Sequence, residues 1–276
     1  MQKIEELFAV AGRGVVVTGG ASGIGLGYAE ALAANGARVT LLDLDPQRIE
    51  TEVGRLRAAG FDVRGAVVDV TDHDALDARI DEAAAHHGLD IVFANAGIDP
   101  GPGYLGAWVG DTRPRIVEGS LENYADRRWD KVIDINLTGV FATLRAAARH
   151  MKPRRSGRMI VTTSAASLRC EPAIGVAYMA AKAGAAHLVR NVALEMAAFN
   201  ITVNAIAPGM FVTNIGGGHL KDEALQAEFG KAIPAHRVGF PSDMYGLALF
   251  LASPASSYVT GQQIVIDGAL SLGQAD

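Results

Sequence analysis

The stretch Val15 to Gly25, VVVTGGASGIG, decides the fold that we predict for this chain. It begins with an apolar, β-branched run typical of a buried strand, and glycines interrupt that run after Thr18. Beyond Gly25 the apolar residues follow helical spacing. A strand, a glycine turn and a helix in this order present the free N–H groups of a helix start to a pyrophosphate. The context favours a nucleotide site over a flexible loop.

Each glycine of this turn meets a different geometric need. Gly19 permits the tight turn, Gly23 lets a phosphate approach the backbone, and Gly25 lets the helix pack closely on the strand. A lone glycine-rich turn is a weak signal, so the prediction depends on the strand before it and the helix after it.

The second predicted strand, Arg38 to Asp43, ends in a carboxylate eighteen positions beyond Gly25. This spacing is close to that at which an acidic side chain meets the adenosine ribose of a dinucleotide. We expect Asp43 to accept hydrogen bonds from both ribose hydroxyls of NAD and to repel the extra phosphate of NADP. Asp45 is a competing candidate, and Ser22 in the glycine loop offers a phosphate no positive charge. The predicted cofactor is therefore NAD.

The composition of the chain limits the number of domains and the classes of partner that we expect. A chain of 276 residues with 49% hydrophobic and 20% charged residues suits one large α/β domain, residues 1–276. The net charge of −5 gives no basic surface for nucleic acid or an anionic membrane. The single cysteine, Cys170, excludes an internal disulfide, and the start MQKIEELFAV is too acidic for a signal peptide. We expect a cytoplasmic protein.

Strands and helices alternate along the whole chain, which predicts a doubly wound parallel sheet with helices on both faces. Ligands bind at the carboxyl ends of such strands, where Asn95, Ala96 and Gly97 follow the fourth. The predicted strands after Asp43 are 62–68, 90–94, 158–163, 201–207 and 263–267. The predicted helices are 46–60, one from a Thr71 cap to Gly88, 129–151, 178–199, 221–229 and 242–252.

Tyr178 and Lys182 are four residues apart on a predicted helix, so both side chains lie on one face. A nearby ammonium stabilises a phenolate and lowers the tyrosine pKa towards neutral pH. Among the six tyrosines of the chain, Tyr178 alone has a lysine at this spacing. The pair is therefore a candidate general acid/base, although such a pair alone is more often a helix-surface contact.

The order of these motifs resembles the short-chain dehydrogenase/reductase family over nearly the whole chain. The resemblance is carried by TGGASGIG at 18–25, Asn95-Ala96-Gly97, Asn136 in INLTG, Ser164, YMAAK at 178–182, Pro208-Gly209 with Thr213, and GQQIVIDG near the end. It implies a Rossmann fold and hydride transfer between an alcohol or ketone and NAD.

The resemblance also implies a role for each matching residue. Tyr178 exchanges a proton with the substrate oxygen, Lys182 holds the nicotinamide ribose, and Ser164 hydrogen-bonds the substrate oxygen. Asn136 holds a water that links Lys182 to solvent. The implied cofactor contacts are Gly19, Ser22, Gly23, Ile24, Gly25, Asp43, Asp69, Val70, Asn95, Ala96, Gly97, Tyr178, Lys182, Pro208, Gly209 and Thr213, with Asp69 and Val70 at the adenine and Thr213 at the carboxamide.

Three features depart from the family pattern. Ala94 stands where a second asparagine is common, and TTSAAS leaves Ser167 as an alternative to Ser164. The segment 97–128 is longer than the family usually has there. That segment and 209–240 are the expected substrate loops, and the glycines at 216–218 suggest a lid hinge.

Large apolar side chains in these loops favour a hydrophobic secondary alcohol or ketone as the substrate. The candidate pocket residues are Tyr104, Trp108, Met210, Phe211, Ile215, Leu220, Leu225 and Phe229, with Glu171 and His219 as polar exceptions. No cluster of side chains has metal-ligand spacing, so no metal is predicted.

The sequence also suggests an oligomeric state and leaves two alternative functions open. Small residues on helix 178–199 and the family resemblance imply a homotetramer or a homodimer. The alternative enzyme is a 3-oxoacyl thioester reductase, for which Arg113, Arg115, Arg127 and Arg128 form the obvious docking cluster, although Asp43 opposes NADPH. The alternative outside enzymes is a catalytically silent NAD-binding regulator, which the joint presence of Asn136, Ser164, Tyr178 and Lys182 opposes.

Overall fold

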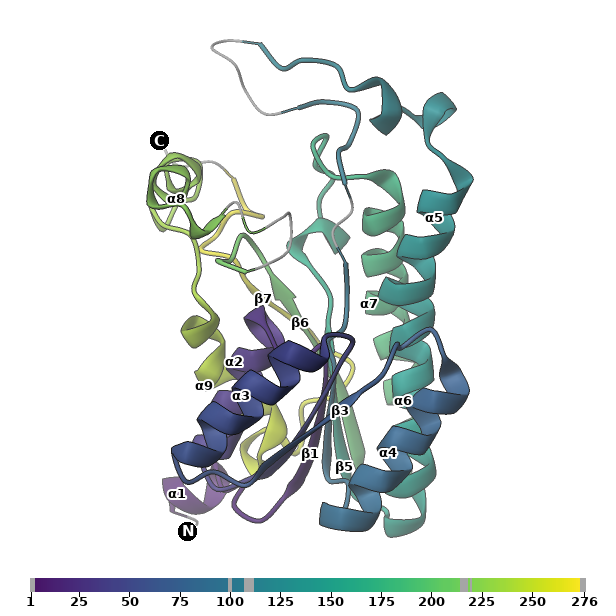
Figure 1. Ribbon diagram of the computed structural model, residues 1–276, viewed down its shortest axis with the longest axis vertical. Helices are drawn as coiled ribbons and strands as arrows, with labels where there is room; N and C mark the ends of the chain where they lie inside the picture. The colour runs from purple at the N-terminus through teal and green to yellow at the C-terminus, as the bar shows by residue number, and fades with distance from the viewer. Residues whose placement is uncertain (1–2, 99–100, 107–111, 214–217, 219, 274–276) are drawn as a thin grey trace.

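The computed structural model describes residues 3–98, 101–106, 112–213, 218 and 220–273. Within these residues seven parallel strands form one sheet in the order β3-β2-β1-β4-β5-β6-β7 (Figure 1). The doubly wound α/β fold predicted from the sequence is confirmed. The strands are β1 Gly14–Thr18, β2 Arg38–Asp43, β3 Val63–Val67, β4 Ile91–Ala94, β5 Gly157–Thr162, β6 Ile201–Pro208 and β7 Gln263–Ile266.

The central strands bury both of their faces, because helices cover the sheet on either side (Figure 1). In β1, Val15 and Val17 pack towards one core and Val16 towards the other, as the alternation of side chains along a strand requires. The first core is completed by α2 Gly23–Ala34, α3 Pro46–Ala58 and α9 Tyr245–Ala252, and the second by α4 His73–His87, α6 Gly139–Arg154 and α7 Val176–Ala197.

The strand order reverses beside β1, and this reversal positions the site. From β1 the chain moves outward through β2 to β3, and it then returns to place β4 on the other side of β1. Loops leaving β1 and β4 therefore diverge and leave a crevice at the carboxyl ends of the strands. The glycine turn after β1 and the segment Asn95 to Gly97 after β4 border this crevice.

The structure corrects two of the predicted helices. Asp72, not Thr71, caps α4, because its carboxylate accepts the N–H of Ala75 while the Thr71 hydroxyl donates to Asp69 instead. The single helix predicted over 129–151 is three consecutive segments, α5 Asp126–Ile133, a π-helical turn η3 Asp134–Thr138, and α6. The apolar spacing runs through all three, so it does not reveal the wider turn in the middle.

The described part of segment 97–128 is irregular, with two short 3-10 turns at 117–119 and 121–123. It is attached to the loop between β5 and α7 by main-chain hydrogen bonds, in which the N–H of Gly103 reaches the Ala173 carbonyl at 2.9 Å. An isolated antiparallel bridge joins Pro102 to Ile174. The remaining helices are α1 Ile4–Leu7 and α8 Glu223–Gly230, and α8 lies at the same end of the molecule as this segment (Figure 1).

Candidate active site

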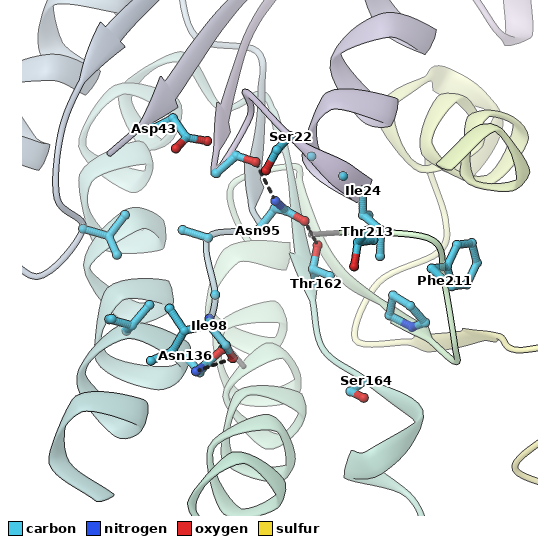
Figure 2. A pocket seen from close by; sticks show the side chains of 18 of the residues that line it. Ser22, Ile24, Asp43, Asn95, Ile98, Asn136, Thr162, Ser164, Phe211 and Thr213 are labelled. Carbon is cyan, nitrogen blue, oxygen red and sulfur yellow. Dashed lines mark hydrogen bonds between the residues drawn. The ribbon is translucent and has the colours of Figure 1, made fainter. Parts of the chain in front are cut away.

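A cavity of about 850 Å³ opens at the carboxyl ends of the strands. Figure 2 shows Asp43 towards one end of it and Ser164 towards the other. The structure brings together every catalytic and cofactor-binding residue named from the sequence, since all of them line this cavity. They are Gly19, Ser22, Gly23, Ile24, Gly25, Asp43, Asp69, Val70, Asn95, Ala96, Gly97, Asn136, Ser164, Tyr178, Lys182, Pro208, Gly209 and Thr213.

The glycine turn has the close approaches that its sequence suggested. Gly19 and Gly23 adopt positive φ angles of 63° and 54°, which other residues rarely adopt. A Cβ on Gly25 would lie 2.2 Å from the Gly19 carbonyl oxygen and 2.5 Å from Asn95 Nδ2. A Cβ on Gly23 would meet the Thr213 side chain at 3.3 Å. Only glycine at position 25 lets α2 begin this close to β1.

The side-chain amide of Asn95 connects the glycine turn to the sheet by hydrogen bonds. Its Nδ2 donates to the carbonyls of Thr18 and Gly19, at 3.1 and 3.2 Å, and its Oδ1 accepts a 2.9 Å bond from the Thr162 hydroxyl (Figure 2). The amide is thus shared between the ends of β1 and β5, which fixes the position of the turn. Asn95 lines the cavity, and its place beside the adenosine of a cofactor stays a prediction.

Backbone N–H groups hold the carboxylate of Asp43 at the end of β2. Its Oδ2 accepts the N–H of Ala21 at 3.0 Å, and its Oδ1 accepts those of Leu44 and Asp45 at 2.8 and 3.3 Å. A carboxylate offers about four acceptor positions, so Asp43 is oriented and still able to accept from a ribose. Asp45, the competing candidate, instead caps α3 by accepting the N–H groups of Gln47 and Arg48.

Arg48 lines the same end of the cavity, and sequence reasoning missed it. It lies on the first turn of α3, and its Nε is 3.0 Å from Asp45 Oδ2. Its position in the sequence could have indicated this placement, because Arg48 is five residues beyond Asp43 and lies in the first turn of the helix that Asp45 caps. The other cavity residues that the sequence did not indicate are Leu42, Leu44, Val68, Ile98, Lys131, Ile135, Thr162 and Thr163.

Asp69 and Val70 follow β3 and form the outer wall of the cavity. The Asp69 carboxylate accepts the N–H and the hydroxyl of Thr71 at 2.9 and 2.8 Å, which closes a tight turn. Val70 is buried, and a Cβ on Gly139 would meet it at 2.9 Å. The wall therefore packs directly on the start of α6.

Lys182 is almost completely buried beside the cavity, with 3% of its surface exposed. Its ammonium donates a 2.8 Å hydrogen bond to the Thr162 carbonyl and lies 5.6 Å from the centre of the Tyr178 ring. Burial lowers the pKa of Lys182 from 10.5 to about 8. The predicted pair of Tyr178 and Lys182 therefore faces one cavity, with the lysine in a poorly hydrated environment.

Asn136 lies in the π-helical turn η3 and is fully buried. Its Oδ1 accepts the N–H of Ile98 at 3.3 Å, and its Nδ2 donates to the carbonyls of Ile98 and Val132 (Figure 2). A Cβ on Gly97 would lie 2.7 Å from Asn136 Oδ1 and 3.5 Å from Lys182 Nζ. The asparagine thus fixes the loop after β4 beside Lys182.

Ser164 and Ser167 have different surroundings. Ser164 lines the cavity, and its hydroxyl accepts the N–H of Ala166 at 3.1 Å (Figure 2). The Ser167 hydroxyl donates to the Ser164 carbonyl at 2.6 Å and accepts from Gln263 at 2.8 Å. Because Ser167 is used within the protein and does not line the cavity, the arrangement favours Ser164 over the alternative.

The pocket candidates from the sequence divide into three groups. Met210, Phe211 and Leu220 line the cavity. The lining of the described structure does not include Tyr104, Glu171, Leu225 or Phe229, so their prediction as pocket walls is wrong for this arrangement. Trp108, Ile215, His219 and the first two glycines of the suggested hinge lie outside the described residues.

The described residues contain neither a cluster of metal-ligating side chains nor a membrane-spanning helix. No group of three or more His, Cys, Asp and Glu side chains there is placed to hold a metal ion. In the same part of the chain, no helix is long and apolar enough to cross a membrane.

The parallel sheet, with a cavity at the carboxyl ends of its strands, is the architecture of nucleotide-binding α/β proteins. A family model described as enoyl-(acyl carrier protein) reductase matches residues 19–271. The chain belongs to the short-chain dehydrogenase/reductase family.

Several relatives are similar over nearly their whole length. The 5-keto-D-gluconate 5-reductase of Escherichia coli strain K12 is 33% identical, covering 97% of this chain and 98% of that protein. The 3-oxoacyl-[acyl-carrier-protein] reductase FabG of Chlamydia pneumoniae is 36% identical over 94% and 97% of the two chains. The crystal structure of a gluconate 5-dehydrogenase from Burkholderia cenocepacia, in complex with NADP and tartrate, has a TM-score of 0.85 at 33% identity over 98% and 100%.

Proposed function

We propose that this oxidoreductase interconverts a hydrophobic secondary alcohol and its ketone, with NAD(H) as the hydride carrier and Tyr178 as the general acid/base. The observation that carries the proposal is the burial of Lys182 beside Tyr178 in a cavity that Ser164 also lines. A bound nicotinamide supplies or accepts the hydride.

The proposed proton path uses residues of this chain alone. In the oxidative direction the substrate hydroxyl gives its proton to the Tyr178 phenolate, and Ser164 donates a hydrogen bond to the substrate oxygen. The Lys182 ammonium stabilises the phenolate electrostatically, and it is held for this by the Thr162 carbonyl. Reduction runs the same steps in reverse, with the tyrosine hydroxyl as the acid.

The cavity residues suit a dinucleotide. The backbone of the glycine turn is open to a phosphate because Gly19 and Gly23 carry no side chain, and α2 starts at Gly23. Asp43 supports the preference for NAD, since it is a fixed negative charge at the end of β2. Arg48 and the NADP complex of the Burkholderia relative are the observations that oppose it. The cofactor assay below decides between them.

An apolar substrate is supported by Ile98, Met210, Phe211 and Leu220 in the cavity lining. A 3-oxoacyl thioester is the second candidate, because relatives such as the chlamydial FabG reduce that class by name. Two arginines of the suggested docking cluster are bound within the protein instead. Arg113 pairs with Glu171 at 3.2 Å, and Arg128 lies 4.9 Å above the Tyr124 ring. The arrangement therefore favours the small hydrophobic substrate.

The test is a spectrophotometric assay at the nicotinamide absorbance, with NAD and NADP against panels of secondary alcohols, sugar acids and 3-oxoacyl thioesters. Tyr178→Phe is expected to lower kcat by about a thousandfold or more, because the proton acceptor is lost. Tyr258→Phe is the matched control, since that side chain is fully exposed. Equal loss in both variants, or faster turnover with thioesters and NADPH, would contradict the proposal.

If the protein is instead a catalytically silent NAD-binding regulator, the wild type and Tyr178→Phe should give a different result. A regulator binds NAD yet turns over no substrate of any panel, and Tyr178→Phe leaves its NAD affinity and its biological effect intact.

We also propose a homotetrameric or homodimeric assembly, supported by apolar side chains exposed on the outer helices, Phe141 on α6 and Leu194 on α7. Light scattering coupled to gel filtration measures the assembly directly.

A further inference from the structure

Tyr28 is a fully buried tyrosine on the second turn of α2, and the catalytic proposal makes no use of it. Its ring stacks on Phe93 of β4, with the ring centres 4.6 Å apart and the planes at 29°. Its hydroxyl lies 3.4 Å from the hydroxyl of Thr162. Thr162 lines the large cavity and Tyr28 does not, so this contact lies behind the cavity wall.

Thr162, the last residue of β5, makes hydrogen bonds in three directions. Its hydroxyl contacts Tyr28 on one side and Asn95 Oδ1, at 2.9 Å, on the other (Figure 2). Its main-chain carbonyl accepts the 2.8 Å bond from Lys182. The side chain of Thr162 therefore connects α2 to Asn95, while its main chain holds the buried lysine.

The direction of each hydrogen bond follows from which atoms can donate. Asn95 Nδ2 faces the carbonyl oxygens of Thr18 and Gly19, so Oδ1 is the amide atom that faces β5. An amide oxygen can only accept, so Thr162 gives its single hydroxyl proton to Asn95. The Tyr28 hydroxyl must then donate to Thr162. Burial raises the pKa of Tyr28 above its ordinary value, which keeps that proton in place.

We propose that Tyr28 and Thr162 are positioning residues for the glycine turn, acting through the amide of Asn95. The inference rests on the proposed function, in which this turn holds the pyrophosphate of a nicotinamide cofactor. Without the Thr162 proton, Asn95 Oδ1 would lack its donor, and the amide would shift to find another. Because the same amide holds two carbonyls of the turn, that shift would displace the peptide groups that face the phosphates.

The space around the amide makes the turn sensitive to such a shift. A Cβ on Gly25 would lie only 2.5 Å from Asn95 Nδ2, so the start of α2 is already in close contact with this side chain. A displaced amide would therefore press on the first turn of α2. Cofactor affinity should depend on the Thr162 hydroxyl, although that hydroxyl lies on a different strand from the turn.

The test compares folding stability and cofactor affinity in the same full-length variants. Thr162→Val keeps the shape of the side chain and the carbonyl that holds Lys182, but it removes the hydroxyl. The Tyr28 hydroxyl and Asn95 Oδ1 then both lack a partner. We expect Tm to fall by about 3–8 °C. In titrations with NADH and NADPH, the Kd of the cofactor that the wild type binds should rise at least about fivefold.

Thr162→Ser restores the hydroxyl and should return this Kd to within about twofold of the wild type. In Thr162→Val, kcat at saturating cofactor should fall less than the cofactor affinity does, because the main-chain carbonyl still accepts from Lys182. A Thr162→Ser variant that binds the cofactor as weakly as Thr162→Val would overturn the proposal.

A second substitution separates a positioning role from a purely structural one. Tyr28→Phe keeps the stacked ring and removes only the hydroxyl, so in combination with Thr162→Val it removes the unpartnered buried donor. Tm of the double variant should recover at least about half of the loss, because both partners are then apolar. Its cofactor Kd should stay as high as in Thr162→Val, since Asn95 Oδ1 still lacks a donor. Recovery of affinity together with stability would overturn the proposal.

The matched control is Thr143→Val, which removes a buried hydroxyl on α6 that donates to the Gly139 carbonyl at 2.8 Å. Its cofactor Kd should stay within about twofold of the wild type, and a rise equal to that of Thr162→Val would contradict the proposal. If Thr162→Val does not fold, Tyr28→Phe alone replaces it. The Kd should then rise about twofold to threefold, because Thr162 loses the donor that orients its hydroxyl; an unchanged Kd would overturn the proposal.

Failure of this inference differs from failure of the proposed function. A wild type that binds neither NADH nor NADPH would overturn both together. A wild type that binds one of them, with the same affinity in Thr162→Val, would overturn the positioning role alone.

Discussion

The glycine-turn wall of the cavity and the two long loops at its mouth are held by different kinds of contact. The wall, Gly19 to Gly25 with Asp43 and Asn95, is fixed by hydrogen bonds between side chains and backbone groups at the strand ends, such as the Ala21 N–H on Asp43. The described parts of the loops, 97–128 and 209–240, are attached by a few main-chain hydrogen bonds and isolated bridges, and also by side-chain pairs such as Arg113 with Glu171.

This difference in contacts indicates which residues can be substituted without loss of catalytic activity. The wall depends on the side chains of Asp43 and Asn95, which bond to backbone groups, and on glycines whose positions leave no room for a Cβ. Contacts between loop side chains depend on the identity of each partner. We therefore expect substitutions in the wall to affect cofactor binding and folding strongly, and substitutions in the loops to affect substrate binding by small factors.

Gly25→Ala should have the largest effect. Its Cβ would lie 2.2 Å from the Gly19 carbonyl oxygen, which is backbone, and 2.5 Å from Asn95 Nδ2. We expect a loss of about 3 kcal/mol of unfolding free energy and at least about tenfold weaker cofactor binding. Urea unfolding and cofactor titration measure both.

The control is Gly54→Ala on α3, where an added Cβ meets nothing within 4 Å. That substitution should stabilise the helix by up to about 1 kcal/mol. If Gly25→Ala were as harmless as Gly54→Ala, the rigidity assigned to the wall would be wrong.

Asp43→Asn should change the cofactor preference next most strongly. Removal of the negative charge should raise the ratio of kcat/KM for NADP over NAD by about tenfold to a hundredfold. Asp45→Asn is the comparison, because that side chain caps α3 rather than holding the end of β2. An equal change of ratio in both variants would show that Asp43 has no special role.

Lys182→Met should separate stability from activity. The pKa of Lys182 is lowered from 10.5 to about 8, so the folded state binds this proton less tightly than the unfolded state does. Below pH 8 the buried charge destabilises the fold, and that penalty is released as pH rises from about 8 to 10.5.

The methionine variant should therefore be more stable than the wild type at pH 7, by about 1–3 kcal/mol, and the difference should shrink towards pH 10. Activity should be almost lost. Urea unfolding at both pH values tests this, and a variant that is destabilised to the same extent at both would refute the assignment of a charged, buried lysine.

Glu171→Gln should have the smallest effect and should act on the loops alone. The Glu171 carboxylate bridges Arg113 and Arg169, at 3.2 Å each, and so connects segment 97–128 to the loop before α7. We expect KM for the substrate to rise about two- to fivefold with an unchanged Kd for the cofactor. Glu195→Gln, which removes an ion pair with Lys152 on the outer helices, is the control. A weaker cofactor affinity in Glu171→Gln would contradict the division between wall and loops.

The sequence by itself determined the elements whose signals are local. The Gly19 to Gly25 turn, the strand end at Asp43 and the Tyr178–Lys182 spacing each lie within a short stretch, so periodicity and residue type suffice to predict them. The strands were located to within about one residue because helices cover both faces of the sheet, which makes the strands continuously apolar. The predicted cap at Thr71, by contrast, is wrong, because the neighbouring Asp72 also carries a capping side chain and is the residue that caps α4.

Only the tertiary structure decided features that depend on distant contacts. The π-helical turn that carries Asn136 does not break the apolar spacing, and its partner Ile98 is 38 residues away. Two further features arise when separate elements pack together. They are the burial that lowers the pKa of Lys182 and the presence of Arg48 in the cavity. The energy of a charged group is set by its surroundings, and those surroundings are not encoded next to it in the sequence.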